Sequence, residues 1–404
     1  MMSAGTRMPD DLVPFLWPGS WAASTGAALL AGTPFNCLVT AGAPPTPAPA
    51  SMKVVSLADA PAVVVKGEWP GVPSQAKSGG GGPTGNPWVD SNAWRIRLAQ
   101  ARNPGRAIWV EFAKPEQGQA VNRLLTLADT AWCGARWIVD IGDELARGLS
   151  EGNSAAKAEW ERLTRAAAFF ERNRARQTLA PAARLGVLSS FEGEDEFLAQ
   201  EVLNLAARRH LAYRILIKGA QFAPQSLAGL RGVLYTDAAP PPQAVLAALS
   251  AFVREGGLLL AAKPTLAAIP GATRTGETLP RAELYRLGKG RIAAPKTDWD
   301  DPYLLALDAH LILSKQNDLA RLYNPGLLLP IVSGDGRRTV VQMVNFAGRG
   351  SANDVALLVQ TPFQAATFCS LEQPEPKPLA VQREAGRNEL YLPPFSIYAA
   401  VELR

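Results

Sequence analysis

The sequence contains little cysteine and little histidine. Its 404 residues include three cysteines, Cys37, Cys133 and Cys369, and two histidines, His210 and His310. The cysteines lie far apart and form no CxxC pair, so neither a disulfide framework nor a zinc site is indicated, and buried free thiols are expected. So few histidines also disfavour metal-dependent catalysis and a serine–histidine–aspartate triad. We therefore expect no metal and no cofactor.

Long apolar runs and blocks of like charge are also missing. No run approaches the roughly 18 apolar residues that a membrane span needs, so no membrane span is expected. The weakly hydrophobic residues 22–32 follow Asp10, Asp11 and Pro18 and make a poor signal peptide, which leaves a cytoplasmic protein as the default expectation. The net charge of +5 is scattered along the chain. Without a basic stripe, no nucleic-acid partner is indicated.

The composition, with 47% hydrophobic and 19% charged residues, is that of a globular α/β chain of more than one domain. Up to about residue 178, short apolar segments alternate with helix-like segments, which predicts parallel strands with right-handed crossovers. The predicted strands cover residues 12–16, 36–40, 62–68, 107–113 and 135–141, and the predicted helices cover residues 22–31, 92–101, 117–131, 143–149 and 154–174.

Two stretches interrupt this alternation. Residues 41–50 carry four prolines, which predict an extended linker, and residues 77–85 carry four consecutive glycines, which predict a mobile loop. A full eight-unit βα barrel takes about 200 residues or more. Residues 1–178 are therefore predicted to form an abbreviated (β/α) barrel.

Two further domains are predicted after this one. Residues 179–326 alternate strands and helices in the order typical of an open, doubly wound sheet, with a hairpin over 283–294 and a helix over 301–314 that starts at Asp301-Pro302. Residues 327–404 contain only short strands between turn residues, which predicts an antiparallel β-sandwich. The predicted strands there cover residues 338–346, 353–361, 364–369, 378–383, 387–392 and 395–403.

The segments "ARLGVLSSFEG", "REGGLLLAAKP", "RRTVVQMVNFAGRGSANDVALLV" and "LPPFSIYAAVEL" carry a resemblance to a known family. Together with the connecting "GKGRIAAPK…WDDPYLLALDAHL", they resemble the bacterial β-galactosidase-type glycoside hydrolases. Those enzymes run from a catalytic barrel through a glutamine-amidotransferase-like domain to a small β-sandwich. The resemblance covers residues 182–404 and implies hydrolysis of O-glycosidic bonds in a carbohydrate ligand. It also implies that "FLWPGSWAAS" and "GPTGNPWVDSN" are substrate-facing loops of a reduced barrel.

Three acidic residues follow predicted parallel strands, where active sites of such folds lie. They are Glu68, Glu111 and Asp140. Glycoside hydrolysis needs one carboxylic acid to protonate the leaving oxygen and a second carboxylate opposite it. With adjacent strands about 4.8 Å apart, Glu68 is the candidate general acid/base and Glu111 the candidate nucleophile, with Asp140 as substitute. The alternative for all three is a structural ion pair or helix cap, and Lys66 and Lys114 lie close in sequence.

The tryptophans concentrate in the first 160 residues, where indole rings can stack on the apolar faces of sugars. Trp69 and Trp88 follow strand signals and are the candidate sugar platforms, with Asp90 and Asn92 as candidate hydroxyl partners. A helix cap at Asp90 or Ser91 is the alternative. The other candidates, expected in the core, are Trp109, Trp132 and Trp137.

The doubly wound domain lacks a cysteine at its strand-to-helix turns, so amidotransferase chemistry is not expected there. We therefore expect that domain to have a structural role or to mediate homo-oligomerisation. Two alternatives to an active glycosidase stay open. The chain could be a catalytically inactive sugar-binding or oligomerising scaffold, or a fragment whose missing part held the chemistry.

Overall fold

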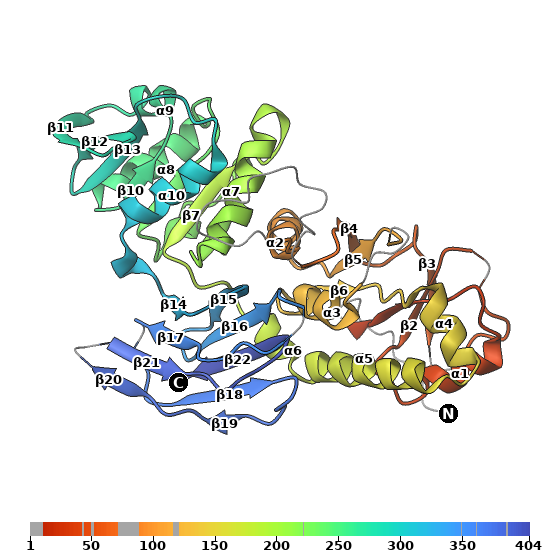
Figure 1. The fold of residues 1–404 in the computed structure, drawn as a ribbon. Coiled ribbons are helices and arrows are strands. Elements are labelled where there is room, and N and C mark those ends of the chain that lie inside the picture. The colour runs from red at the N-terminus through yellow and green to blue at the C-terminus, as the bar shows by residue number, and fades with distance from the viewer. Residues whose placement is uncertain are drawn as a thin grey trace, which may run out of the picture.

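The computed structural model describes residues 11–42, 44–49, 52–71, 89–115, 121–220, 222–348, 350–360, 362–384 and 387–404. Figure 1 shows an N-terminal region in red to yellow, a middle region in green to cyan, and a C-terminal region of blue strands. The long yellow helix α5 (Ser154–Arg172) reaches from the N-terminal region towards the C-terminal strands. The described part of the chain contains no helix that is long and apolar enough to cross a membrane.

The strands of the N-terminal region pair in parallel throughout. They are β1 (Pro14–Leu16), β2 (Cys37–Thr40), β3 (Lys53–Ser56), β4 (Val63–Gly67), β5 (Ile108–Phe112) and β6 (Arg136–Trp137). They form two three-stranded sheets, β1-β2-β3 and β4-β5-β6, which a parallel bridge between Phe15 and Val139 joins. Between β3 and β4 the described residues form no pairing. Among the described residues, the result is an arc of six strands with no pairing that closes it into a barrel.

The helices of this region cover one face of the arc. They are α1 (Ala23–Leu30), α2 (Ala93–Arg102), α3 (Arg123–Ala131), α4 (Gly142–Ser150), α5 and α6 (Arg174–Gln177). The main core lies between these helices and outward-pointing strand residues such as Val110. Because side chains alternate along a strand, the remaining residues, among them Cys37, Val39 and Trp109, form a second buried cluster on the inner face.

Three details of this region differ from the sequence predictions. Strand β3 was not predicted, because its four residues lie just beyond a proline-rich stretch and carry too short an apolar run. Residues 41–50 therefore connect two neighbouring strands of one sheet. The predicted strand 135–141 is reduced to two residues and a bridge. The predicted glycine-rich loop 77–85 lies outside the described residues.

The middle region holds one seven-stranded sheet in the order β11-β12-β13-β10-β9-β7-β8. Its strands are β7 (Leu185–Ser189), β8 (Tyr213–Ile217), β9 (Gly232–Tyr235), β10 (Leu258–Leu260), β11 (Thr273–Thr278), β12 (Ala282–Leu287) and β13 (Gly290–Pro295). The first four and β13 run parallel, with β8-β7-β9-β10 in the order typical of flavodoxin-like sheets. The hairpin β12–β13 is confirmed, and β11 extends it.

Helices cover both faces of this sheet. One face carries α7 (Glu196–Arg208) and α10 (Pro302–Leu313), and the other carries α8 (Gln243–Arg254) and α9 (Lys263–Ala267). Helix α10 begins as predicted, because the side chain of Asp301 accepts hydrogen bonds from Tyr303 N and Leu304 N at 2.8 and 3.2 Å.

The C-terminal region consists of two antiparallel sheets that share one buried core. One sheet has the order β14-β17-β21-β20 and the other β15-β16-β22-β18-β19. The strands are β14 (Ala320–Tyr323), β15 (Leu328–Gly334), β16 (Thr339–Asn345), β17 (Ala356–Val359), β18 (Ala366–Ser370), β19 (Lys377–Pro378), β20 (Gln382–Glu384), β21 (Arg387–Tyr391) and β22 (Tyr398–Leu403). Strands β14 and β15 were not among those predicted.

The connection between the first two regions is tied to the third. Ala182 N donates to Val332 O at 3.0 Å, and Gly334 N donates to Ala180 O at 2.9 Å, so the connecting segment pairs along β15. Residues 180–182 are therefore fixed against the C-terminal region.

Candidate functional site

The carboxyl ends of β4, β5 and β6 bring the predicted acidic residues to one edge of the arc. The strands are neighbours in the order that the sequence predicted, with β4 beside β5 and β5 beside β6. Glu68 and Glu111 therefore belong to adjacent strands, and Asp140 follows the strand beyond. We call this part of the molecule the carboxyl edge.

The two glutamates at the carboxyl edge have different basic partners. Glu68 pairs with Arg95 of α2 at 2.5 Å. Glu111 pairs with Lys66, which lies directly opposite it on β4. Glu111 lies two residues after the buried Trp109 on β5. Because residues two apart on a strand point to the same face, Glu111 also points to the inner face. The side chain of Glu68 is 65% exposed and that of Glu111 is 26% exposed.

Asp140 has a local structural contact. Its Oδ1 accepts a hydrogen bond from Gly142 N at 2.8 Å, where α4 begins. A carboxylate at this position also complements the positive end of the helix dipole. The structure thus places Asp140 in the role of a helix-start residue.

Asn92, a candidate sugar partner, is used inside the protein. It is 1% exposed, and its Nδ2 donates to Glu68 O and to Asp129 Oδ2, both at 2.8 Å. Its Oδ1 accepts from Glu68 N at 2.9 Å. The side chain therefore fixes the loop that carries Glu68, and it does not face a ligand.

Asp129 on α3 completes this arrangement, and the sequence analysis missed it. It is fully buried and accepts hydrogen bonds from Ser91 Oγ and from Asn92 N at 2.7 and 2.9 Å. Burial raises the pKa of Asp129 to about 6, against the opposing effect of these hydrogen bonds. A lone aspartate within the apolar run of 124–131 was the only signal in the sequence.

Of the two predicted sugar platforms, Trp69 and Trp88, the structure describes only Trp69. The ring of Trp69 stacks on Phe112, with centroids 4.9 Å apart, and its Nε1 donates to Ala113 O at 3.0 Å. Trp69 keeps partial exposure beside the carboxyl edge. Asp90 forms a two-way backbone bridge with Gly71, and Trp88 lies outside the described residues. As predicted, the core holds the indoles of Trp109, Trp132 and Trp137.

A cavity of about 1020 Å³ opens next to the loop that carries Trp69. Pro70 and Gly71 contribute to its wall, together with α3, α5 and loops of the C-terminal sheets. Arg123 pairs with Glu159 there at 2.6 Å, whereas Arg162 has no ion pair among the described residues. The charged residues of the lining are therefore mainly basic, and they lie among many apolar side chains.

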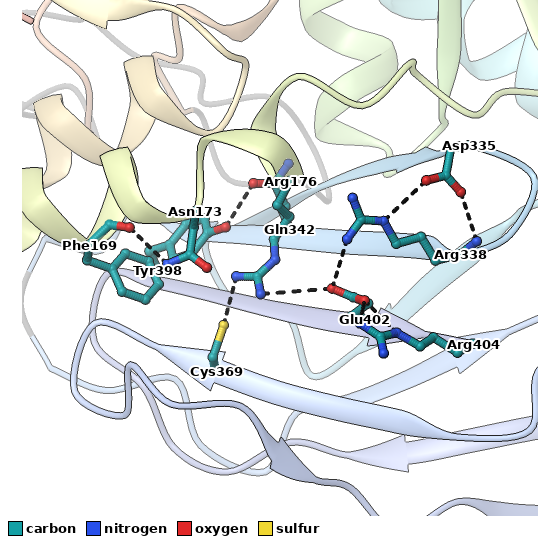
Figure 2. Close-up of polar contacts among 10 residues, drawn as sticks. All are labelled: Phe169, Asn173, Arg176, Asp335, Arg338, Gln342, Cys369, Tyr398, Glu402 and Arg404. Atoms are coloured by element: carbon teal, nitrogen blue, oxygen red, sulfur yellow. Dashed lines mark hydrogen bonds and ion pairs between the residues drawn. The ribbon is translucent and has the colours of Figure 1, made fainter. Parts of the chain in front are cut away.

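The most extensive buried ion-pair network lies elsewhere, between α6 and the five-stranded sheet (Figure 2). Glu402 is buried and faces three arginines, Arg176 at 4.0 Å, Arg338 at 3.6 Å and Arg404 at 2.6 Å. Arg176 also donates to Cys369 Sγ at 2.9 Å, and burial raises the pKa of that thiol. Breaking a buried pair leaves an uncompensated charge, so this network locks the N-terminal region onto the sheets.

The two histidines and the three cysteines take structural positions. His210 Nε2 lies 2.9 Å from Leu328 O, and burial lowers the pKa of His210 to about 4. His310 pairs with the buried Asp318 at 3.0 Å. The predicted free, buried thiols are confirmed. Among the described residues no cluster of three or more histidine, cysteine or acidic side chains could hold a metal ion.

Comparison with known proteins gives similarity in fold only. No family model and no curated protein matches the sequence. A rhamnosidase from Novosphingobium sp. PP1Y is similar with a TM-score of 0.53 and 13% identity, over 94% of this chain and 38% of that chain. A β-galactosidase from Bacillus circulans sp. alkalophilus is similar with a TM-score of 0.52 and 10% identity, over 78% of this chain and 58% of that chain.

A GH42 β-galactosidase from G. stearothermophilus is also similar, with a TM-score of 0.51 and 10% identity, over 80% of this chain and 58% of that chain. The chain thus spans between 38% and 58% of the length of these three proteins. The similarity is one of fold alone, because the sequence identities are 10–13%. In fold, the chain resembles the multi-domain glycoside hydrolases.

Proposed function

We propose that the chain is a carbohydrate-binding relative of the glycoside hydrolases that does not cleave its ligand. The observation that carries this proposal is the pairing of the two glutamates at the carboxyl edge. Glu68 is paired with Arg95 and Glu111 with Lys66, so each carboxylate already has its own basic partner. A glycosidase needs two carboxyl groups that converge on one bond, one of them as a proton donor.

The features around Trp69 support sugar binding at this edge. An indole that rests on Phe112 has one face supported and is held at a fixed angle, which reduces the entropy cost of stacking a sugar ring. The adjacent cavity of about 1020 Å³ offers room for more than one sugar unit. Arg162 and its neighbours would donate hydrogen bonds to hydroxyls.

The order of the three regions is consistent with a glycoside hydrolase whose barrel is shortened. In this proposal residues 1–178 are an abbreviated barrel, residues 179–326 an amidotransferase-like domain and residues 327–404 a β-sandwich. The middle domain has no nucleophilic cysteine and would serve as a structural or oligomerising unit. The part of this region that the structure describes supports this view, because it contains six parallel strands against the eight of a full barrel.

The second candidate function is hydrolysis, with Glu68 as general acid/base and Glu111 as nucleophile. It is favoured by their position on adjacent strands. Glu68, one member of the Glu68–Arg95 pair, is exposed, and ion pairs at the surface contribute only about 0–1 kcal/mol. A bound glycoside could therefore displace it.

Calorimetric titration with galactosides and rhamnosides tests the sugar-binding proposal, because these are the sugars in the names of the structural neighbours. We expect wild-type protein to bind at least one of them, and Trp69→Ala to weaken binding by about tenfold through lost stacking. Trp69→Phe, which keeps the contact with Phe112, should show a smaller loss, and Glu194→Gln in the middle region should show none. Absence of binding, or equal binding by Trp69→Ala and wild type, contradicts the proposal.

A further inference from the structure

The cavity beside the loop of Trp69 has α5 as one of its walls. Arg162, Ala166 and Phe169 of this helix line it at the three- and four-residue spacing that places side chains in one row. The loops that follow β16 and β18 and the residues before β22 also contribute to the lining. Figure 1 shows α5 extending towards these C-terminal strands. We call this cavity of about 1020 Å³ the α5 groove.

The charged residues that line the α5 groove are mainly basic, and the acidic ones already have partners. They are Arg123, Arg162, Arg165, Arg172, Glu159 and Glu372. Glu159 pairs with Arg123 at 2.6 Å, and Glu372 Oε1 accepts a hydrogen bond from Ser396 N at 3.2 Å. The exposed side chains of Arg162 and Arg172 form no ion pair or hydrogen bond with a described residue. Two positive charges at the groove thus lack a negative partner among the residues that the structure describes.

The arginines of α5 are spread along the groove. Arg162 and Arg172 are ten residues apart on the helix, which corresponds to about 15 Å at the rise of an α-helix. Arg165 lies between them, 72% exposed and 4.0 Å from Glu161, and a surface ion pair of this kind is weak. A cleft lined by charges of one sign attracts ligands of the opposite sign. The spacing fits an extended ligand with several negative groups, because a single sugar ring or phosphate cannot reach both ends.

Accessible apolar side chains also line the α5 groove. Pro70, Leu124 and Leu371 are half-buried, and Pro374 is exposed. Ligand sites combine apolar surface of this kind with a few polar groups that fix the orientation of the ligand. The apolar faces of sugar rings can cover these side chains, whereas an inorganic polyanion would leave them in contact with water. The lining therefore favours a ligand that has both sugar rings and negative charges.

We propose that the α5 groove binds an acidic oligosaccharide, a sugar chain that carries carboxylate or sulfate groups. Its negative groups pair with Arg162 and Arg172, while one of its rings rests on Trp69. Glu68 and Glu111 are not among the lining residues, so the negative groups lie away from them. This inference rests on the proposed function, because it names the class of sugar that the same site takes.

Calorimetric titration of the full chain with three tetrasaccharides tests this inference. They are tetragalacturonate, a sulfated galactotetraose and neutral galactotetraose. We expect at least one acidic ligand to bind about tenfold more tightly than the neutral one, because charge-assisted hydrogen bonds are stronger than neutral ones. The tighter acidic ligand identifies the anionic group. Added salt should weaken its binding and leave that of galactotetraose unchanged.

Substitutions on α5 locate the charge effect. Arg162→Gln and Arg172→Gln should each weaken binding of the acidic ligand about threefold to tenfold. Binding of galactotetraose should change little, because glutamine still donates hydrogen bonds to hydroxyls. Lys157→Gln is the matched control and should bind as wild type does, because Lys157 is an exposed cation of the same helix that does not line the groove. Trp69→Ala should weaken acidic and neutral ligands by the same factor.

Two results would overturn this inference while the proposed function stands. The first is equal affinity for acidic and neutral tetrasaccharides, and the second is unchanged affinity for the acidic ligand in the double variant Arg162→Gln/Arg172→Gln. Inorganic tetraphosphate that binds as tightly as the acidic tetrasaccharide would also contradict the inference, because the sugar rings would then have no role. If folded wild-type protein binds none of the oligosaccharides or glycosides, the inference and the proposed function both fail.

Discussion

The two ends of β4, β5 and β6 differ in how their charges are compensated. At the carboxyl edge, Glu68 and Glu111 each have a basic partner, Arg95 and Lys66. At the other end of β5, Arg97 and Arg106 line a cavity of about 360 Å³, and no described carboxylate forms an ion pair with either of them. In glycoside hydrolase folds the carboxyl ends of the strands are where chemistry is expected. In this chain Arg97 and Arg106, which have no described ion-pair partner, lie at the other end of the strands. An anionic ligand would therefore be stabilised more strongly there than at the carboxyl edge.

The largest effect is expected from the buried ion-pair network of Glu402. Glu402→Gln leaves Arg176 buried without its carboxylate, which should lower the free energy of unfolding by about 3–5 kcal/mol. Chemical denaturation measures this loss. Glu375→Gln, at an exposed position of the same region, is the control and should unfold as wild type does. A loss of less than about 1 kcal/mol for Glu402→Gln would show that the network does not hold the regions together.

A pH-dependent effect is expected at the carboxyl edge from Asp129. Its pKa in the folded protein, about 6, lies above the ordinary value of 3.8, so the folded state binds the proton more tightly. The ionised form is therefore penalised, and stability should fall as pH rises from about 4 to above 6, by about 3 kcal/mol in total.

Asp129→Asn should remove this part of the pH dependence. Unfolding measured at pH 4 and pH 7 for both proteins gives the difference, and wild type should lose stability relative to the variant as pH rises. Asp143→Asn, at an exposed site, should follow wild type. A variant that tracks wild type at both pH values would show that Asp129 titrates in the ordinary range.

The smallest effect is expected from the ion pairs of the carboxyl edge. Glu68→Gln and Glu111→Gln should each change the free energy of unfolding by about 1 kcal/mol or less, because both pairs have an exposed member. Thermal unfolding of the two variants beside wild type measures this. A much larger loss for Glu111→Gln would mean that its pair with Lys66 is part of the core, and the two ends of the strands would then be less different than we infer.

Local sequence signals predicted the elements that such signals control. Asp301-Pro302 placed the start of α10, and the glycines after residue 255 placed the end of α8. The alternation of short apolar runs and helices predicted parallel strands, and with them the adjacency of Glu68 and Glu111.

The interactions that the sequence did not predict are those between distant residues. Asn92 was expected to face a ligand. Instead, its side-chain amide donates a hydrogen bond in the interior to Asp129, which lies 37 positions away in the sequence. Arg176 and Cys369 are separated by 193 positions. Strands β3, β14 and β15 owe their pairing to neighbours and not to their own short apolar runs.

The most direct test of the account is prolonged incubation of wild-type protein with chromogenic galactosides and rhamnosides, beside the double variant Glu68→Gln/Glu111→Gln. If the carboxyl edge binds without cleaving, wild type and the double variant release chromophore at the same background rate. Turnover by wild type that the double variant loses would contradict the account and establish these two glutamates as a working catalytic pair.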